Sequence, residues 1–333
     1  MKYRPLGSTG LTVSELGFGC GIVGGILVRG EYPTMRRVVS RAIELGINYF
    51  DSAPMYGDGQ SEVNLGAVLR ELRADVLVGT KVHLKVSDLQ RPEAAVVESV
   101  DQSLRRLGRD HIDLIQLHNP LGAPGPANWA PMAASDLAAV TRASQSLQGQ
   151  GKVRFWGITA LGQTEALHQA VAAGGLHTIQ AVYNLLNPSA GTSVPPDFPF
   201  QDYRQLMARA ADREIGVIVI RVLAGGALAG TVDRHPTAAP TVDPIGSGQA
   251  YDADVAHARS FAFLRDAGLV RSPVEAAIRF VLSRSEVSTA LVGISSPEQL
   301  EHAVESANRG PLPADALARI HDVQARFAQG GPA

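Results

Sequence analysis

Four residues of types that often act in catalysis come directly after short apolar runs, or close behind one. Asp51, Lys81 and His118 each follow such a run, and Tyr56 comes shortly after Asp51, between a proline and a glycine. Runs of this kind predict buried strands that end where the polar residue opens a loop. We therefore expect the ends of neighbouring strands to hold these four side chains around one point.

The four residue types suit acid–base chemistry on a carbonyl group. A tyrosine is a weak acid, with an ordinary pKa of about 10. A neighbouring Lys81 ammonium is expected to lower the pKa of Tyr56, because a positive charge stabilises phenolate. Asp51 would keep Lys81 charged and in place, and His118 would orient a carbonyl oxygen by donating a hydrogen bond. The four residues therefore predict a proton-transfer site.

Eight strand-and-helix units are expected to position these residues. The predicted strands cover residues 15–19, the run to Phe50, 76–80, 112–117, 153–158, 178–182, 216–220 and 288–292. The predicted helices cover residues 34–45 with Thr34 as N-cap, about 60–72, a segment from Arg91, about 136–149, a segment to Ala173, about 202–213, 273–284 and 297–307. The strands are too apolar to have a solvent-exposed face, which implies a parallel sheet covered by helices on both faces. Eight strand-and-helix units in sequence predict a closed (β/α)8 TIM barrel.

Two features near the start of the chain bear on the choice of fold. Residues 1–14 predict a small β-hairpin around the turn formers at 7–10, which could cap one end of the barrel. Residues 19–24 match G-x-G-x-x-G, a pattern typical of the first turn in a doubly wound open sheet. A lone match is weak evidence, and the further glycine that follows it favours a flexible loop. The barrel is therefore the preferred interpretation.

Long loops follow three of the predicted strands. They cover residues 119–135, 186–201 and 231–260, and they are rich in proline, glycine and aspartate. Loops that follow the strands of such a barrel lie on its carboxyl face, where the active sites of this fold are built. Candidates for lining a substrate pocket there, or for packing within the loops, are Trp129, Phe198, Phe200 and Tyr251, with Met55 and Tyr183 as further candidates. No domain boundary stands out, so residues 1–333 are expected to form one barrel domain.

The composition indicates a globular protein with a well-filled core. The hydrophobic share is 45%, the charged share is 19% and the formal net charge is −2, which gives no reason to expect nucleic acid or a membrane surface as a partner. The one cysteine, Cys20, cannot form a disulfide within the chain, and the histidines lack the spacing of metal ligands, so no metal is expected. No signal peptide or membrane-spanning run is visible, so the expected location is cytoplasmic.

The four residues and their surroundings resemble the aldo-keto reductases along essentially the whole chain. The most specific matches are residues 46–57, 61–62, 65–66, 79–81, 113–118 and 293–300. The resemblance implies a barrel that binds a nicotinamide cofactor across its carboxyl face and passes hydride to an aldehyde or ketone carbon. It also implies that Tyr56 supplies the proton, helped by Lys81 and Asp51, with His118 at the carbonyl oxygen.

The resemblance further implies a set of cofactor-binding residues. They are Gly21, Asp51, Thr159, Gln180, Arg221, Leu223, Gly225, Leu228, Gly293, Ser295 and Gln299. Thr159 and Ala160 stand where the family usually has a Ser-Asn pair at the carboxamide, and no aromatic ring follows the seventh barrel strand. Gly293 and Gln299 stand where cations often bind the 2′-phosphate of NADP, although Arg221 offers some compensating charge. The expected cofactor is therefore NADP(H) or NAD(H).

The predicted function is that of an NAD(P)(H)-dependent oxidoreductase, which interconverts aldehydes or ketones with alcohols, or sugar hemiacetals with lactones. Tyr56 is its expected general acid and base. One alternative is a Schiff-base aldolase or lyase with Lys81 as nucleophile, and another is a cofactor-binding regulatory subunit with little turnover. The expected partner is a small carbonyl or sugar substrate, and the expected assembly is a monomer or a small homo-oligomer. The substrate and the preferred direction stay open at this point.

Overall fold

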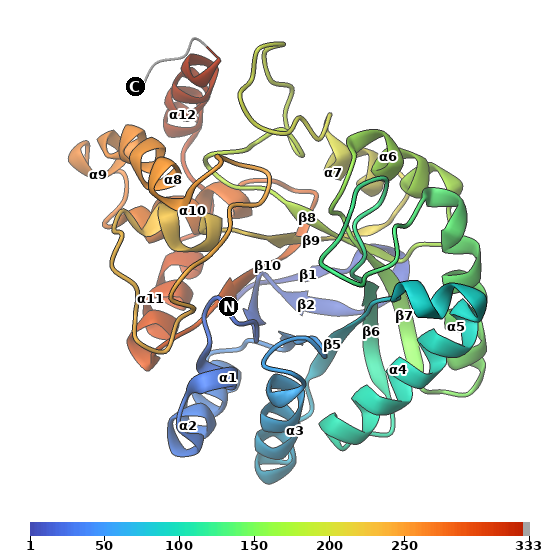
Figure 1. Cartoon of the computed structure of the whole chain (residues 1–333). Helices are drawn as coiled ribbons and strands as arrows, with labels where there is room; N and C mark the ends of the chain where they lie inside the picture. The colour runs from blue at the N-terminus through green and yellow to red at the C-terminus, as the bar shows by residue number, and fades with distance from the viewer. Residues whose placement is uncertain (329–333) are drawn as a thin grey trace.

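The computed structural model describes residues 1–328, and its centre is a closed barrel of eight parallel strands (Figure 1). The strand order β10-β3-β4-β5-β6-β7-β8-β9 confirms the predicted (β/α)8 barrel. Residues 329–333 of the predicted domain lie outside the described part. The strands are β3 (Leu16–Gly19), β4 (Tyr49–Asp51), β5 (Leu77–Val82), β6 (Ile112–Leu117), β7 (Val153–Thr159), β8 (Thr178–Val182), β9 (Gly216–Ile220) and β10 (Val287–Gly293). Most of their residues are buried, which explains apolar runs in place of an alternating pattern.

Helices surround the barrel, as Figure 1 shows. Those that complete the eight units are α2 (Tyr32–Glu44), α3 (Gln60–Leu72), α4 (Pro92–Leu107), α5 (Leu137–Gly149), α6 (Thr164–Ala173), α7 (Leu206–Ala211), α10 (Pro273–Leu282) and α11 (Pro297–Asn308). Proline begins α4, α10 and α11, where its missing N–H would have had no partner in the helix. Ser272 and Ser296 cap α10 and α11 by accepting hydrogen bonds from the N–H groups of Glu275 and Gln299.

Two predicted helix starts were wrong. α2 begins at Tyr32 with Glu31 in the N-cap position, so Thr34 is not the cap. Pro33 explains the earlier start, because its fixed φ favours the first turn of a helix. α7 is shorter than the predicted span of 202–213, because Arg204 and Gln205 have φ angles of 48° and 58°. A right-handed helix cannot contain that left-handed conformation.

Further helices lie where the sequence predicted none. The predicted loop at 231–260 contains α8 (Tyr251–Ala258), whose polar sequence carries almost no apolar spacing. The other unpredicted helices are α1 (Ile26–Arg29), α9 (Phe263–Asp266) and α12 (Ala314–Phe327). Short 3-10 helices are η1 (Gly7–Thr9), η2 (Val86–Gln90), η3 (Ala134–Asp136), η4 (Ala224–Ala229) and η5 (Arg259–Phe261). None of the helices in the described part of the chain has the length and apolar character needed to cross a membrane.

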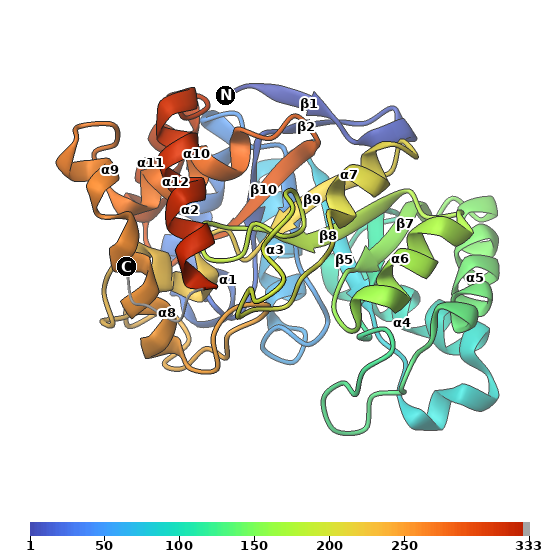
Figure 2. The ribbon, with the colours of Figure 1, turned by 90° about the horizontal axis from the view of Figure 1, so that it is seen from above.

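A β-hairpin covers one end of the barrel, as predicted. β1 (Tyr3–Pro5) and β2 (Thr12–Ser14) pair antiparallel, with η1 between them. Figure 2 shows this hairpin at one end of the molecule and the loop after β6 at the opposite end. The hairpin's apolar residues pack with Tyr49, Leu114, Ile218 and Leu291 of the barrel strands. Leu291 also lines the main cavity, so this cluster separates the hairpin from the cavity.

Candidate active site

A buried ion pair joins the ends of β4 and β5. The Nζ atom of Lys81 donates to one carboxylate oxygen of Asp51 and, at 2.7 Å, to the carbonyl oxygen of Ser52. The side chains of Lys81 and Asp51 are only 2% and 4% exposed. The barrel register explains the contact, because Asp51 lies beside Gly79, two residues before Lys81 on the neighbouring strand. Each charge compensates the other in a place where an unpaired charge would be costly.

Tyr56 lies beside this ion pair, in the turn after β4. The Nζ atom of Lys81 is 4.9 Å from the centroid of the Tyr56 ring. Tyr56 is partly exposed. Burial raises the pKa of Tyr56, and the positive charge of Lys81, which lowers this pKa, does not cancel the rise. The expectation of a net lowered pKa was therefore wrong, although the sign of the Lys81 contribution was right. At neutral pH, Tyr56 is a neutral phenol that carries its proton.

A chain of hydrogen bonds runs from Asp51 across β8 and β7 to His118. The Nε2 atom of Gln180 donates to the second carboxylate oxygen of Asp51 at 2.6 Å. The hydroxyl of Thr159 donates to Gln180 Oε1 at 3.1 Å, and its oxygen lies 3.0 Å from His118 Nδ1. Thr159 and Gln180 are direct neighbours in the register of β7 and β8. Five neighbouring strands, β4 to β8, therefore supply one continuous polar network, with Lys81 on β5 and His118 directly after β6.

His118 follows β6 and is neutral at physiological pH. Burial and the positive charge of Lys81 lower the pKa of His118 to about 3. Its ring contacts Trp129 of the following loop edge-on, with the ring centroids 5.6 Å apart. The imidazole therefore carries one ring proton, and Trp129 packs against it.

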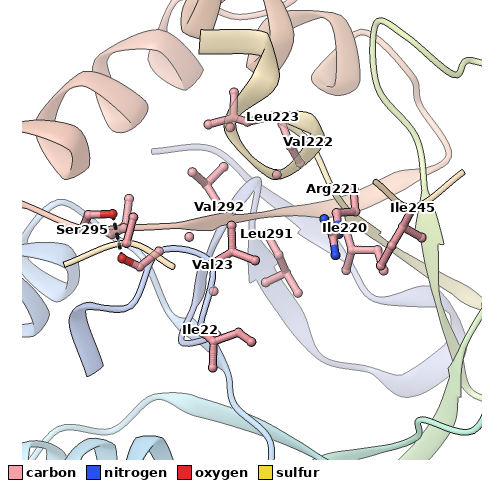
Figure 3. Close-up of a pocket in the computed structure, with 18 of the residues that line it drawn as sticks. Ile22, Val23, Ile220, Arg221, Val222, Leu223, Ile245, Leu291, Val292 and Ser295 are labelled. Atoms are coloured by element: carbon pink, nitrogen blue, oxygen red, sulfur yellow. Dashed lines mark hydrogen bonds between the residues drawn. The ribbon is translucent and has the colours of Figure 1, made fainter. Parts of the chain in front are cut away.

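These residues line a cavity of about 540 Å³, which Figure 3 shows from close by. Its lining includes Asp51, Tyr56, Lys81 and His118, together with Gly21, Thr159, Gln180, Arg221, Leu223, Gly225, Gly293, Ser295 and Gln299. The structure thus brings together all but one of the predicted catalytic and cofactor-binding residues. Leu228 is the exception, since it is 2% exposed and packs in the hydrophobic core under η4. In this tight turn its side chain points away from the cavity.

Close backbone approach shapes two walls of the cavity. In Figure 3, Val222 and Leu223 lie on one side of the cavity, and Ile22 and Val23 lie on another. Within η4, Gly225 has a φ of 70°, and a Cβ atom there would lie 2.7 Å from the side chain of Val242. A side chain is therefore unfavourable at this position on the cavity wall, and glycine suits it.

Two arginines on the cavity wall differ in how many hydrogen bonds their guanidinium groups already donate within the protein. Arg234 donates to the carbonyl oxygens of Gly225, at 2.8 Å, and of Ala239, so its donors are largely occupied. Arg221 donates to the carbonyl oxygen of Asp243 at 3.1 Å, and within residues 1–328 it forms no ion pair. An unpaired arginine on a cavity wall is suited to bind an anion.

Some contributing residues were missed and some candidates lie elsewhere. Tyr49 donates to Asp51 at 3.1 Å, and its position two residues earlier on the same strand face was the available signal. Arg234 was also missed, because nothing in its loop sequence marks it. Of the aromatic candidates, Trp129 and Tyr251 line the cavity, as does Met55. Phe198 and Phe200 pack against each other, and Tyr183 stacks on Phe280.

The residues in this cavity offer proton donors and acceptors rather than metal ligands. Across residues 1–328, no three side chains of histidine, cysteine, aspartate or glutamate lie close enough to hold a metal ion. The arrangement combines a neutral phenol, a buried ammonium and a neutral imidazole on one wall. Such a set can move a proton to or from an oxygen atom held in the cavity.

Comparisons with known proteins agree with this geometry. The model of the Aldo/keto reductase family matches residues 15–325. L-galactose dehydrogenase of Arabidopsis thaliana is 29% identical, over 91% of this chain and 87% of that protein. NADH-specific methylglyoxal reductase of Escherichia coli (strain K12) is 28% identical, over 95% of this chain and 96% of that protein. A solved structure, an aldo-keto reductase from Bacillus halodurans in its holo form, has a TM-score of 0.72 at 26% identity, over 97% of this chain and 96% of that one.

Proposed function

The chain belongs to the aldo/keto reductase family, and we propose that it interconverts an alcohol or sugar hemiacetal with the corresponding carbonyl compound or lactone, with Tyr56 transferring the proton. As a member of this family, the protein is an oxidoreductase that uses a nicotinamide cofactor. One observation carries the finer proposal. The buried pair of Asp51 and Lys81 lies beside Tyr56, on the wall of the same cavity as His118.

Each side chain has a defined part in the proton transfer. In the reducing direction, the hydroxyl of Tyr56 gives its proton to the carbonyl oxygen as the carbon becomes an alcohol, and in the oxidising direction it takes the proton back. Lys81 stabilises the phenolate that forms in between, because its ammonium is held next to the ring. Asp51 fixes Lys81 in that position. The bound nicotinamide supplies or accepts the hydride.

The cavity suits an elongated dinucleotide. Its volume of about 540 Å³ lies in the range of cofactor sites. Thr159 and Gln180 would hold the carboxamide, and Arg221 with the backbone around Leu223 and Gly225 would hold the pyrophosphate. This assignment is supported by the unpaired guanidinium of Arg221 and by the glycine-lined wall of η4.

The far end of the cavity would hold the adenosine part of the cofactor. Gly293, Ser295 and Gln299 line this end, and none of them carries a charge. The Oγ atom of Ser295 donates to the carbonyl oxygen of Gly24 at 2.6 Å, a contact that Figure 3 shows dashed. The N–H group of Ser295 donates to Gln299 Oε1 at 2.9 Å. A 2′-phosphate would meet no cation among these three residues, so we propose that NAD(H) binds at least as well as NADP(H).

The alternative functions find less support. A Schiff-base mechanism needs a neutral amine on Lys81. Burial acts to lower the pKa of Lys81, but the adjacent Asp51 and Tyr56 together outweigh it and raise that pKa above its ordinary value. The amine is therefore held in its unreactive, charged form. A regulatory subunit with little turnover is less favoured, since the whole acid–base network is present.

A turnover assay tests the proposal. The purified protein is mixed with NADH or NADPH and a panel of aldehydes, or with NAD or NADP and a panel of alcohols and sugars, and nicotinamide absorbance is followed. We expect turnover on part of the panel, and a loss of about 10²- to 10⁴-fold in Tyr56→Phe. Tyr251→Phe is the matched control, because Tyr251 lines the same cavity beside Arg234. Full activity in Tyr56→Phe would exclude Tyr56 as the proton donor.

A further inference from the structure

A second cavity, termed here the side groove, adjoins the active-site cavity on the carboxyl face of the barrel. Its volume is about 600 Å³, and it shares two lining residues, Leu161 and Ile245, with the active-site cavity. The loops after β6, β7, β8 and β9 enclose it, through Pro120, Pro124, Gly162, Gln163, Gln201 and Pro244. A ligand in the active-site cavity can therefore reach the side groove past the two shared residues.

The shared residues lie away from the end of the cavity that is assigned to the adenosine part of the cofactor. In Figure 3, Ile245 and Ser295 lie on opposite sides of the cavity. Ser295 lines the adenosine end, so a cofactor bound in that direction leaves the side of Ile245 to the substrate. Leu161 comes two residues after Thr159, whose hydroxyl oxygen lies 3.0 Å from His118 Nδ1. A substrate whose reacting oxygen lies beside His118 can therefore extend into the side groove.

Hydrogen bonds between the loops give the side groove its shape. The N–H group of Leu121 donates to the carbonyl oxygen of Leu161 at 2.8 Å, and the N–H group of Gln163 donates back to the carbonyl oxygen of Leu121 at 2.7 Å. The Nε2 atom of Gln201 donates to the carbonyl oxygen of Gly162 at 2.7 Å. These contacts join the loops after β6, β7 and β8. A ligand would therefore meet a formed surface, which reduces the entropy lost on binding.

The lining of the side groove indicates a neutral occupant that carries hydroxyl groups. None of the residues that line the groove is charged, so a charged group would find no partner there. Gln163 is exposed and its side chain makes no capping hydrogen bond to α6, so its amide can donate to a ligand and accept from it. Gln201 uses its NH₂ group within the protein and offers its Oε1 atom as an acceptor. A sugar ring matches this lining, because its hydroxyl groups both donate and accept while its C–H groups face the apolar walls.

We propose that the side groove is a subsite for a second sugar ring, so that the protein oxidises the reducing end of a disaccharide. The hemiacetal of the first ring lies at the catalytic residues. The second ring passes between Leu161 and Ile245 into the side groove, where its hydroxyl groups bond to the amides of Gln163 and Gln201. The inference rests on the proposed function, because it names the substrate class of the same site.

The reaction at the first ring leaves the second ring unchanged. The anomeric carbon loses a hydride, and with it two electrons, to the oxidised nicotinamide. The anomeric hydroxyl loses its proton to the phenolate form of Tyr56, and the first ring becomes a lactone. The glycosidic bond between the rings stays intact, so the second ring contributes to binding alone.

Kinetics with matched sugars test the subsite. We measure kcat/KM with the oxidised cofactor for cellobiose and maltose against glucose, and for galactobiose against galactose. At least one disaccharide should exceed its monosaccharide by about 10-fold, the worth of one or two hydrogen bonds. Oxidation of the monosaccharides with no disaccharide above its monosaccharide would overturn the inference.

Two variants locate the effect in the side groove. Ala123→Trp fills the groove and should abolish the advantage of the disaccharide. Gln163→Ala removes one amide and should lower kcat/KM for the preferred disaccharide by about 3-fold, while the value for the monosaccharide changes by less than about 2-fold. Gln169→Ala is the control, since Gln169 is an exposed glutamine of α6 that does not line the groove. Equal losses for both sugars in the two groove variants would mean general damage and would reject the inference.

Binding without turnover separates this inference from the proposed function. The methyl glycosides of the same sugars have no hemiacetal, so the anomeric carbon cannot be oxidised. Isothermal titration calorimetry, on protein saturated with oxidised cofactor, measures their Kd values. We expect at least one disaccharide glycoside to bind about 10-fold more tightly than its monosaccharide glycoside, and Ala123→Trp to remove the difference.

The two possible failures then look different. Tighter binding of a disaccharide glycoside without turnover of any sugar would contradict the proposed function alone. Turnover of the sugars with no tighter binding of any disaccharide glycoside would contradict the side-groove subsite alone.

Discussion

At the scale of single residues, the site depends on one buried charge compensating another. Asp51 accepts hydrogen bonds from Lys81, Tyr49 and Gln180, so both of its oxygens are satisfied inside the barrel. Lys81 is satisfied by Asp51 and by the carbonyl oxygen of Ser52. The pair therefore does more than shift the proton affinity of Tyr56. It also makes the folded state depend on keeping both charges.

Removing one charge of this pair should destabilise the protein strongly. We expect Lys81→Met to lower the free energy of unfolding by about 3–5 kcal/mol, because it leaves the carboxylate of Asp51 unpaired in the core. The double variant with Asp51→Asn should be more stable than Lys81→Met. Arg91→Ala is the control, since it removes an exposed pair with Glu98 and should cost no more than about 1 kcal/mol. Denaturant unfolding measures all three, and a double variant less stable than Lys81→Met would contradict this account of the pair.

The pH dependence of reduction should follow Tyr56 and not His118. A proton donor works below its pKa and is lost as the pH rises through it, and the pKa of Tyr56 is raised. The pKa of His118 is lowered to about 3, so His118 does not titrate near neutral pH. We therefore expect kcat/KM for aldehyde reduction to be level from about pH 6 to pH 9 and to fall only at higher pH. An inflection near pH 6.5 would show that a histidine of ordinary pKa controls the reaction.

Arg221 should contribute an anion contact to cofactor binding. Its guanidinium has one hydrogen bond to a carbonyl oxygen and, in the described part of the chain, no ion pair. We expect Arg221→Gln to raise the Kd of NADH by about 10-fold, the worth of a charge-assisted hydrogen bond, with a weaker dependence on salt. Arg271→Gln, on the exposed surface, is the control. Fluorescence titration measures both, and an unchanged Kd in Arg221→Gln would place the pyrophosphate elsewhere.

At the scale of elements, η4 determines how closely a ligand can approach the backbone. Gly225 has a left-handed φ of 70° and has no room for a Cβ atom beside Val242. We expect Gly225→Ala to cost about 1 kcal/mol or more in stability and to weaken cofactor binding. Gly149→Ala is the matched control, because a Cβ atom at the end of α5 meets nothing within 4 Å. Equal cofactor affinity in Gly225→Ala and the wild type would show that η4 does not contact the cofactor.

The elements also show how far sequence patterns reach. Strands such as β6, β8 and β9 were predicted at their observed bounds, because buried parallel strands are continuous apolar runs between turn formers. α8 was missed because its segment lacks apolar spacing, and α7 was overextended because the left-handed residues before it leave no local pattern. In the site, Asp51, Tyr56, Lys81 and His118 could be predicted from strand ends. The hydrogen bonds through Thr159 could not, because they depend on residues of β4, β7 and β8 and on His118 after β6 meeting in space.

At the scale of the whole molecule, the cavity occupies the carboxyl end of the barrel, and the loop after β3 is tied to the loop after β9 beside it. The guanidinium of Arg29 donates to the carbonyl oxygen of Thr237 at 2.9 Å, and the N–H group of Ala239 donates to the carbonyl oxygen of Val23 at 3.2 Å. A ligand between these loops would contact distant parts of the chain at once. Binding should therefore stabilise the whole fold.

Thermal unfolding should report this coupling and the choice of cofactor. A ligand that binds only the folded state adds about 2.7 kcal/mol at a concentration of 100 times its Kd, which corresponds to a rise in Tm of several degrees. We expect NADH to raise the Tm at least as much as NADPH at equal concentration, because no cation lines the cavity at Gly293, Ser295 and Gln299. A clearly larger rise with NADPH would show that another residue binds the 2′-phosphate.

The most direct test of the central claim is the single-turnover rate of hydride transfer, measured by stopped-flow absorbance in the wild type and in Tyr56→Phe. Cofactor affinity is measured on the same samples, so that a change in chemistry is not confused with a change in binding. If the Tyr56 hydroxyl beside the Lys81 ammonium supplies the proton, the rate should fall about 10²- to 10⁴-fold while the Kd of the cofactor stays the same. Transfer at the wild-type rate in Tyr56→Phe would contradict the account.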